Sequence, residues 1–482
     1  MVPDLERITQ LLGLLGDPQV AYPSVHVTGT NGKGSVVRMV GALCSAAGLS
    51  AGTYTSPHLQ TVRERLSLAG RPISAERFAG IHDEVAALAD LVDQALEARD
   101  GADADHVTYF ELLTAMALWW FADVPVDVAV VEVGMGGRWD ATNLVRSDVA
   151  VLNEVDVDHP QLGGTPAEVA REKVGIIKDG SHVVAAAQPD EVQDVLEAAV
   201  AEHDATLWQL GDQLEVVDRR IAVGGQLLTL RVGDRVVDEV LLPLYGAHQA
   251  RNAALALGAF AALTGDSFAS MDDDVVRHGL GAVQVPGRLE VVHRDPTVLL
   301  DGAHNPHGAR AAAAALSEAF EFRDLVLVVA CLDDKDIVGL LRELQGVPAH
   351  VVVTTSDGPR AASLETMVAA AEEVWRGTGI AVEAAADLDA ALELATGIVG
   401  EGDGILVAGS LITVGAARDR YLPVRDDEED DVVIAPDDEQ TGADDQLDEG
   451  DLEELEALLE DENAFQHALE RLLDDEPDDD ED

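Results

Sequence analysis

Basic residues are scarce in this sequence of 482 residues. It contains 31 Lys and Arg against 91 Asp and Glu, which gives a formal net charge of −60. Nucleic-acid binding requires a positive surface that displaces counterions from phosphate, and anionic membranes attract polybasic segments. The charge balance therefore argues against both partners, and we expect no nucleic acid and no membrane among them.

Cysteine and long apolar runs are also scarce. The two cysteines, Cys44 and Cys331, are too few for a disulfide framework, which indicates a reducing compartment. No basic-then-apolar leader opens the chain, and no apolar run approaches the ~18 residues of a membrane-spanning helix. Apolar residues still make up 47% of the chain, enough for more than one core. We expect a cytoplasmic protein of two or three domains.

Lysine is the scarcest basic residue, and the acidic residues are unevenly distributed. Only Lys33, Lys173, Lys178 and Lys335 occur, so each is expected to do what Arg cannot. Residues 426–482 carry 29 acidic and one basic side chain, and the other 425 residues carry a net −32. The acidic side chains of residues 1–425 repel one another in dilute buffer. Molar salt shortens the Debye length to ~3 Å and so screens this repulsion. We interpret residues 1–425 as adapted to high salt; an ordinary acidic protein is the alternative.

Strand-like runs alternate with helical patterns in the first 205 residues. We expect strands at 24–27, 126–133 and 149–152, and a helix at 35–44. This alternation predicts βαβ units around a mostly parallel sheet. Residues 206–243 instead suggest short strands with a hairpin at Gly224-Gly225, and hence a small antiparallel annex, followed by a helix at 247–264.

A second alternating set follows, with expected strands at 298–300, 325–329, 350–354 and 405–408. The predicted fold class is therefore α/β, with an ATP-binding domain at 1–286, a smaller Rossmann-like domain at 287–425 and an acidic tail at 426–482. The leucines of the tail fall roughly on one helical face, so it is either a helix that binds a protein partner or a solvated acidic segment.

The strongest local signal is a glycine-rich turn between an expected strand and helix. Glycines let successive backbone N–H groups surround an anion, the helix N-terminus adds its dipole, and a lysine reaches the β- and γ-phosphates. Gly34 stands between Lys33 and Ser35, so the usual G-x-x-x-x-G-K-[ST] spacing is not met, and an ordinary turn is the alternative. We assign phosphate binding to Gly29, Thr30, Asn31, Gly32, Lys33, Gly34 and Ser35.

Polar residues follow three further buried runs. Glu132 ends one of them, where a buried charge is costly unless it meets a cation such as Mg²⁺. His159 follows the next run and Lys173 comes shortly after; a lone histidine is more often structural. In the second domain, Asp301 and His304 lie on a turn that can present them to the cleft between the domains.

Together these segments resemble the folylpolyglutamate synthase and dihydrofolate synthase family, relatives of the Mur ligases, over residues 1 to about 425. The resemblance rests on the following runs: Thr55-Ser56-Pro57-His58-Leu59, Gly134-Met135-Gly136-Gly137-Arg138 and Asp301-Gly302-Ala303-His304-Asn305-Pro306. It implies a Mur-ligase-type fold, a monomer, and an ATP-dependent ligase. Such a ligase joins L-glutamate to dihydropteroate, to tetrahydrofolate or to both, through an acyl phosphate.

The resemblance also implies residue roles. Ser56, Glu132 and His159 would ligate magnesium, with two magnesium sites in all, and Lys173 would be N-carboxylated. Asn252, Arg288 and Asp301 match ATP contacts, and the catalytic residues would be Lys33, Lys173 and His304. Two alternatives remain: a Mur-type ligase for another acceptor, and a non-catalytic nucleotide-binding module whose tail binds a partner.

Overall fold

The computed structural model describes residues 4–101, 104–157 and 160–424. Its N-terminal part is built on a mostly parallel sheet whose strands run in the order β4-β3-β2-β5-β1-β6-β7-β8. The strand bounds are β1 Ser24–Thr28, β2 Ala51–Tyr54, β3 Leu66–Leu68, β4 Arg71–Pro72, β5 Val128–Glu132, β6 Val149–Leu152, β7 His182–Ala185 and β8 Thr206–Gln209. The antiparallel pairs of this sheet are β2 with β3 and β3 with β4, and its other pairs are parallel. The predicted parallel sheet is confirmed.

Side chains of the central strands alternate between two cores, as the period of a strand requires. Val25, Val27 and Val130 pack with the helices α2 (Lys33–Ala46) and α7 (Ala247–Thr264). Ala129 and Val131 face the opposite core. That core is built by α1 (Glu6–Leu14), α3 (Ala75–Asp100) and α4 (Tyr109–Asp123). Because helices cover both faces of the sheet, the central strands are continuous runs of apolar residues.

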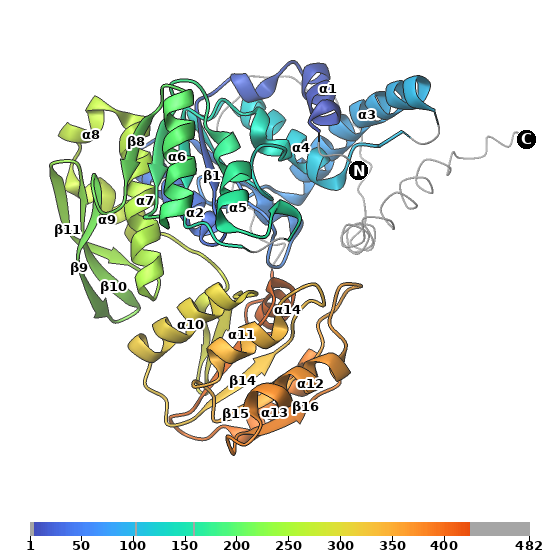
Figure 1. Cartoon of the computed structure of the whole chain (residues 1–482), viewed down its shortest axis with the longest axis vertical. Helices are drawn as coiled ribbons and strands as arrows, with labels where there is room; N and C mark the ends of the chain where they lie inside the picture. The colour runs from blue at the N-terminus through green and yellow to red at the C-terminus, as the bar shows by residue number, and fades with distance from the viewer. Residues whose placement is uncertain (1–3, 102–103, 158–159, 425–482) are drawn as a thin grey trace, which may run out of the picture.

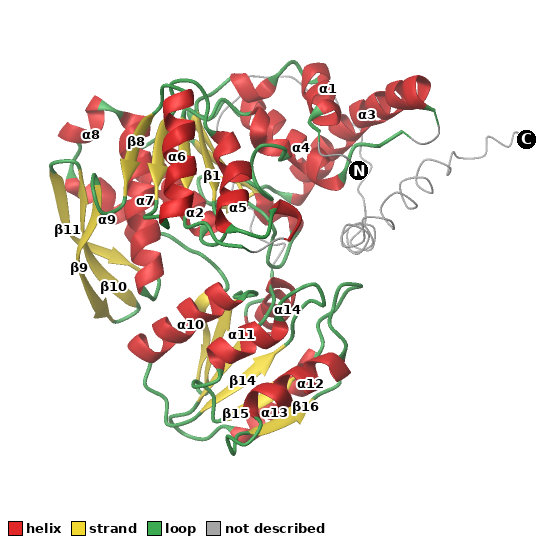
Figure 2. Ribbon diagram, viewed as in Figure 1, coloured by secondary structure: helices red, strands yellow, loops and turns green. Residues whose placement is uncertain are grey.

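The antiparallel annex consists of β9 (Leu214–Ala222), β10 (Gly225–Val232) and β11 (Arg235–Leu242), and it lies beside α7 (Figure 2). The predicted hairpin at Gly224-Gly225 is confirmed, because β9 and β10 flank this turn. The predicted start of the annex at residue 206 is wrong, since β8 pairs parallel with β7 in the main sheet. Four residues are too short a run for the pattern to distinguish the two partners.

The C-terminal sheet has the strand order β12-β13-β17-β14-β15-β16. The bounds are β12 Arg288–Arg294, β13 Thr297–Asp301, β14 Leu325–Val329, β15 His350–Val353, β16 Ala381–Ala384 and β17 Gly404–Ala408. The four buried strands were predicted. The outer strands β12 and β16 were missed because β12 is only partly buried and β16 is largely exposed, so neither is a buried apolar run.

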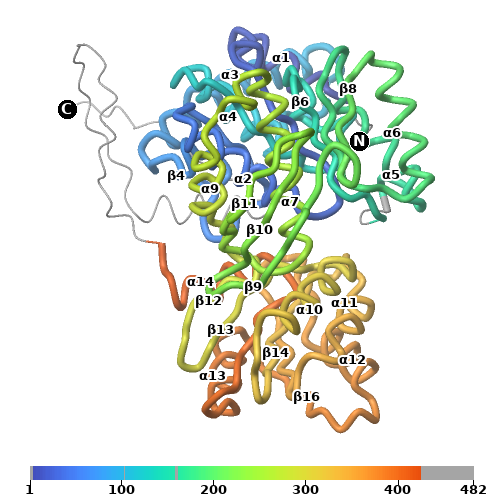
Figure 3. Tube along the Cα trace, turned by 90° about the vertical axis from the view of Figure 1, so that its left-hand side faces the viewer, coloured from blue at the N-terminus to red at the C-terminus, as the bar shows by residue number. Residues whose placement is uncertain are grey.

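Helices complete both parts. Those of the C-terminal part are α10 Pro306–Ala319, α11 Ile337–Leu344, α12 Leu364–Trp375, α13 Leu388–Ile398 and α14 Leu411–Tyr421. The remaining N-terminal helices are α5 Pro166–Lys173, α6 Asp190–Glu202, α8 Asp266–Ser270 and α9 Asp273–Gly281. The C-terminal part lies below the N-terminal one with α10 and α14 uppermost (Figure 1). A view turned by 90° again shows the two parts stacked (Figure 3).

Among the described residues no helix has both the length and the apolar content to cross a membrane. The acidic tail and His159 lie outside the described residues. The domain limits at 286/287 and 425/426 therefore stay predictions, although β12 begins at Arg288.

Candidate active site

The glycine-rich loop joins the end of β1 to the start of α2 and packs tightly against a neighbouring strand end. Gly29 and Gly32 have positive φ angles of 147° and 79°. A Cβ atom on Gly29 would lie 2.7 Å from Cβ of Asn153, which follows β6. The positive φ angles favour glycine at both positions, and the close contact with Asn153 also excludes a side chain at Gly29. The loop therefore keeps its backbone N–H groups close to the carboxyl edge of the sheet, where parallel α/β folds bind ligands.

The Lys33 side chain lies over this loop. Its Nζ donates to the carbonyl oxygens of Gly29 (3.3 Å) and Thr30 (3.5 Å). The Thr30 hydroxyl donates to the carbonyl of Asp156 (2.8 Å) and accepts from the backbone N–H of the same residue (2.9 Å). Thr30 thus fixes the loop to the segment after β6, while Lys33 supplies the positive charge.

A chain of buried polar side chains supports the loop from α7. Asn252 Oδ1 accepts from Asn153 Nδ2 (2.9 Å), and Asn252 Nδ2 donates to Gln249 Oε1 (3.0 Å). Gln249 Nε2 in turn donates to the Ser35 hydroxyl (3.3 Å). The structure therefore places the predicted residue Asn252 at the loop. Gln249 was missed, because one polar residue in a buried helix carries no signal of its own.

Glu132 ends β5 directly behind the loop. It is 4% exposed, and among the described residues its carboxylate accepts one hydrogen bond, from the Ser56 backbone N–H (3.1 Å). Burial raises the pKa of Glu132, against the opposing effect of the Lys33 charge. A Cβ on Gly34 would lie 3.2 Å from Glu132 Oε2, which explains the glycine between Lys33 and Ser35.

This donor set fits a hard cation. A buried carboxylate beside a hydroxyl residue and a phosphate loop has the oxygen chemistry that Mg²⁺ prefers, and a cation offsets the cost of burying the charge. No cluster of three or more His, Cys, Asp or Glu that could hold a metal occurs in the described ranges. The third predicted ligand, His159, lies outside those ranges, so its role stays a prediction.

Lys173 ends α5 and is buried against the phosphate loop. It is 4% exposed, and its Nζ donates to the Gly29 carbonyl at 2.9 Å. The Gly-Gly-Arg run packs against the same segment: a Cβ on Gly137 would lie 2.8 Å from the Lys173 carbonyl, and the Arg138 backbone N–H donates to Glu172 (2.9 Å). One of the runs that carry the family resemblance therefore holds the buried lysine in place.

Lys178 supports this arrangement from the following turn. Its Nζ donates to Asn143 Oδ1 (2.8 Å), while Asn143 Nδ2 donates to the carbonyls of Arg138 (2.9 Å) and Gly175 (3.1 Å). Burial lowers the pKa of Lys178. This lysine has a structural role beside the site.

Residues of the C-terminal sheet face the loop. Arg288 and Asp301 are register partners on β12 and β13. Asp301 accepts from the backbone N–H groups of Leu289 (3.0 Å) and Ala303 (2.9 Å), and burial raises its pKa despite the Arg288 charge. His304 Nδ1 lies 3.0 Å from the Gly302 carbonyl, which places a proton on Nδ1.

The two parts meet through hydrogen bonds and enclose a pocket. Asn305 Nδ2 donates to Asn31 Oδ1 (3.1 Å), and Asn31 Nδ2 lies 3.0 Å from His307 Nδ1. The pocket is lined by residues of both parts, among them Gly32, Ser35, Asn252, Arg288, Asp301 and His304. Residues predicted separately from two sheets thus share one pocket, whereas Asn305 and His307 had been given no role.

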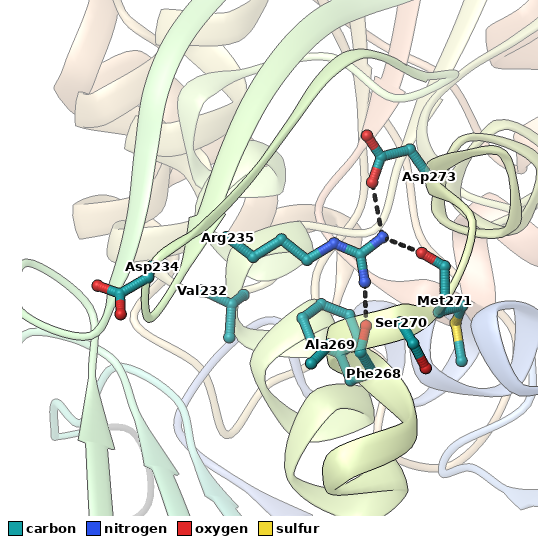
Figure 4. A pocket seen from close by; sticks show the side chains of 8 residues that line it. All are labelled: Val232, Asp234, Arg235, Phe268, Ala269, Ser270, Met271 and Asp273. Carbon is teal, nitrogen blue, oxygen red and sulfur yellow. Dashed lines mark hydrogen bonds and ion pairs between the residues drawn. The ribbon is translucent and has the colours of Figure 1, made fainter.

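A separate cavity lies between the annex and α8 (Figure 4). The Arg235 guanidinium donates there to the carbonyls of Phe268 and Met271 and to Asp273, and it lies over the Phe268 ring. All of these contacts are made within the protein, and they hold the annex against α8.

The family models agree with this architecture. A model described as "Mur ligase middle domain" matches residues 85–260, and one described as "Mur ligase, glutamate ligase domain" matches residues 287–411. Fold and cleft together define a ligase of the Mur ligase superfamily.

Curated proteins and solved structures narrow the assignment. The chain is 45% identical over 437 residues to the "Dihydrofolate synthase/folylpolyglutamate synthase" of Mycobacterium tuberculosis, covering 86% of this chain and 89% of that protein. A structure of the folylpolyglutamate synthase of that organism, complexed with ADP and AMPPCP, matches with a TM-score of 0.83 and 44% identity, covering 87% of this chain and 95% of that one. The chain belongs to the folylpolyglutamate synthase/dihydrofolate synthase family.

A more distant structure adds a second ligand. It is described as E. coli FolC in complex with DHPP and ADP, and it matches with a TM-score of 0.75 and 28% identity, covering 87% of this chain and 93% of that one.

Proposed function

We propose that this chain is an ATP-dependent amide ligase that adds L-glutamate to dihydropteroate, to tetrahydrofolate or to both. The observation that carries the proposal is the pocket in which the phosphate loop of one part meets Arg288 and Asp301 of the other. The names of the relatives supply the class of acceptor, and their bound ADP and AMPPCP support the use of ATP. The E. coli complex with DHPP supports a pterin acceptor.

The reaction has two steps. The acceptor carboxylate attacks the γ-phosphorus of ATP, which forms an acyl phosphate and releases ADP. The amine of L-glutamate then attacks the acyl carbon, loses a proton and displaces phosphate to leave an amide. Negative charge accumulates on phosphate oxygens in both steps, so fixed positive charge lowers both barriers. Lys33 supplies that charge at the γ-phosphate, and Arg288 supplies it from the C-terminal side.

Other residues bind and orient. Asn252 and the loop N–H groups hold the nucleotide, and Arg288 and Asp301, which lie opposite each other on β12 and β13, contact it from the C-terminal part. The proton on His304 Nδ1 leaves Nε2 as the nitrogen that can accept the amine proton of glutamate. We assign this step of the reaction to His304.

Magnesium, when bound with the nucleotide, would supply further positive charge to the transferred phosphate, with Ser56, Glu132 and His159 as its predicted ligands. N-carboxylation of Lys173 would turn its amine into a second anionic group that can face a second magnesium ion. That chemistry requires an amine, which accounts for a buried lysine in a chain that otherwise prefers Arg.

We also propose a monomer that works in the cytoplasm. Both cysteines are buried and unpaired, which suits a reducing compartment.

A side-by-side assay tests the function. The purified full chain is given ATP, Mg²⁺, L-glutamate and either dihydropteroate or tetrahydrofolate in multimolar KCl, and ADP release is measured together with the glutamylated product. Glutamate-dependent ADP release with at least one acceptor is expected. Release with neither acceptor would overturn the proposal, and release with an unrelated acceptor alone would instead favour a Mur-type ligase. Nucleotide binding without turnover would favour a binding module.

A further inference from the structure

His307 connects the two parts of the molecule at the phosphate loop. It lies in the first turn of α10, and its side chain is 28% exposed. Its Nδ1 is 3.0 Å from Asn31 Nδ2, and its Nε2 is 3.6 Å from Glu154 Oε1. The ring therefore lies between a residue of the loop and a carboxylate that follows β6.

The orientation of Asn31 determines which ring nitrogen carries the proton. Asn305 caps α10, because its Oδ1 accepts from the Gly308 backbone N–H (2.8 Å). This cap points Asn305 Nδ2 at Asn31 Oδ1 (3.1 Å), so Asn31 turns its own Nδ2 toward His307. An amide nitrogen only donates, and His307 Nδ1 must therefore accept. The single ring proton then lies on Nε2, facing Glu154.

A second proton changes both contacts. Protonated Nδ1 would set its N–H against the Asn31 N–H, so this hydrogen bond is lost. The charged ring is at the same time attracted more strongly to Glu154. Asn31 cannot turn over to compensate, because its amide nitrogen would then face the amide nitrogen of Asn305, which the helix cap holds in place.

We propose that His307 is a positioning residue through which protonation controls nucleotide binding at the phosphate loop. The neutral ring holds Asn31, the residue directly before Gly32 and Lys33, in the position that binds phosphate. The doubly protonated ring gives up this hydrogen bond and is drawn to Glu154, so that Asn31 keeps only its two amide contacts with Asn305 (3.1 and 3.4 Å). The neutral form is thus the form that binds nucleotide.

The surroundings raise the pKa of His307. The Glu154 carboxylate, which also pairs with Arg251 (3.9 Å), raises the pKa of His307, and Asp156 adds to this effect, whereas burial and Arg310 oppose it. His248 also faces the ring from α7; burial lowers its pKa to about 4, so it stays uncharged across the relevant range. The pKa of His307 thus lies above the ordinary histidine value of ~6.5.

The first test measures the titration itself. The pKa of His307 is followed by NMR of the imidazole in the full chain at constant KCl, with and without AMPPCP, and its signal is assigned by its absence from H307Q. Because coupling is reciprocal, a nucleotide that prefers the neutral ring must weaken proton binding. Loss of one neutral hydrogen bond corresponds to a proton affinity about three- to tenfold lower with AMPPCP. An unchanged titration would overturn the proposal.

The second test is kinetic and rests on the proposed use of ATP. The KM for ATP is expected to rise about three- to tenfold as the pH falls through the transition, with kcat changing less. H307Q removes the titrating group and should abolish this rise. The control is H203Q, which removes a histidine whose Nδ1 lies 2.7 Å from Asp179 Oδ1 outside the pocket, and it should keep the rise. Persistence of the rise in H307Q would refute the role of His307.

The E154Q variant provides an independent kinetic test in case H307Q does not fold. It removes the carboxylate that raises the pKa of His307, so the rise in KM should move to lower pH. An unmoved rise in E154Q contradicts the proposal. Absence of turnover at every pH would refute the proposed ligase activity, whereas the NMR titration with AMPPCP would still decide the coupling.

Discussion

The buried amine of Lys173 donates a hydrogen bond to the carbonyl of Gly29 at 2.9 Å. Gly29 is the first residue after β1, and Lys173 lies 144 residues further along the chain at the end of α5. This contact joins the phosphate loop to the segment that the Gly-Gly-Arg run packs against. Two of the four lysines thus meet at one glycine, since Lys33 Nζ also donates to the Gly29 carbonyl (3.3 Å).

Replacing Lys173 by Arg tests the need for an amine. The guanidinium is longer, cannot be N-carboxylated and has no room at a 4% exposed position, so we expect kcat to fall by about a hundredfold or more. The measurement is ADP release at saturating substrates. K335R, at a lysine of the C-terminal part, serves as the control and should keep the parent rate. Activity near the parent level in K173R would rule out the carboxylated lysine.

Gly34→Ala should separate stability from activity. The new Cβ would lie 3.2 Å from Glu132 Oε2 and displace the predicted metal ligand, which should lower kcat/KM about tenfold. The gain in helix propensity, about 0.5–1 kcal/mol in a helix interior, is opposed at this first turn of α2 by the close contact with Glu132, so the free energy of unfolding should change little. Urea unfolding and steady-state kinetics measure the two effects.

Gly80→Ala is the matched control for that substitution. Gly80 lies in α3 with nothing within 4 Å of its added Cβ. G80A should gain about 0.5–1 kcal/mol of stability with unchanged activity. A G34A enzyme as active as G80A would contradict the packing of Glu132 against the loop.

Two substitutions of Asn305 distinguish helix capping from contact with the loop. N305D keeps the acceptor that caps α10 but loses the donor to Asn31, so the KM for ATP should rise severalfold with little loss of stability. N305A loses both and should also cost about 1 kcal/mol of stability. If N305D binds ATP as well as the parent, the contact between Asn31 and Asn305 does not position the loop.

The histidine at position 26 should affect the pH dependence of stability. Burial lowers the pKa of His26 to about 3 in the folded state, whereas an exposed histidine titrates near ~6.5. Between about pH 4 and 6 the unfolded chain therefore binds a proton that the folded chain does not, and stability rises with pH by ~1.4 kcal/mol per pH unit from this group. H26N should lower the slope of the free energy of unfolding by that amount in urea titrations. An unchanged slope would show that His26 is already protonated in the folded protein.

Salt dependence tests the interpretation of the acidic surface. If 425 residues with a net −32 repel themselves, Tm and activity should rise as KCl increases from 0.1 to 2 M. A chain truncated after residue 425 removes a further −28 and should keep its activity and show a weaker salt response. A full-length protein equally stable at both salt concentrations would leave the acidity without an adaptive role. Loss of activity on truncation would instead indicate a functional role of the tail.

Much of the fold was predictable because the signals were local. The strand at 24–28, the glycine turn and helix α2 are neighbours in the chain, and their apolar periods and glycines are readable in a short window. The exposed edge strand β16 and the four-residue strand β8 were not predictable in the same way. Their partners, not their own residues, determine where they lie.

The sequence by itself determined the residue types of the site: a phosphate loop with a lysine, a carboxylate at the end of a buried strand, and an Asp-His turn in a second sheet. Only the tertiary structure decided which of them meet. Gln249 lies 214 residues from Ser35, and Asn305 lies 274 residues from Asn31, yet each pair is hydrogen-bonded. The physical reason is that strand register, helix packing and the docking of the two parts set these contacts, and a local pattern contains no information about them.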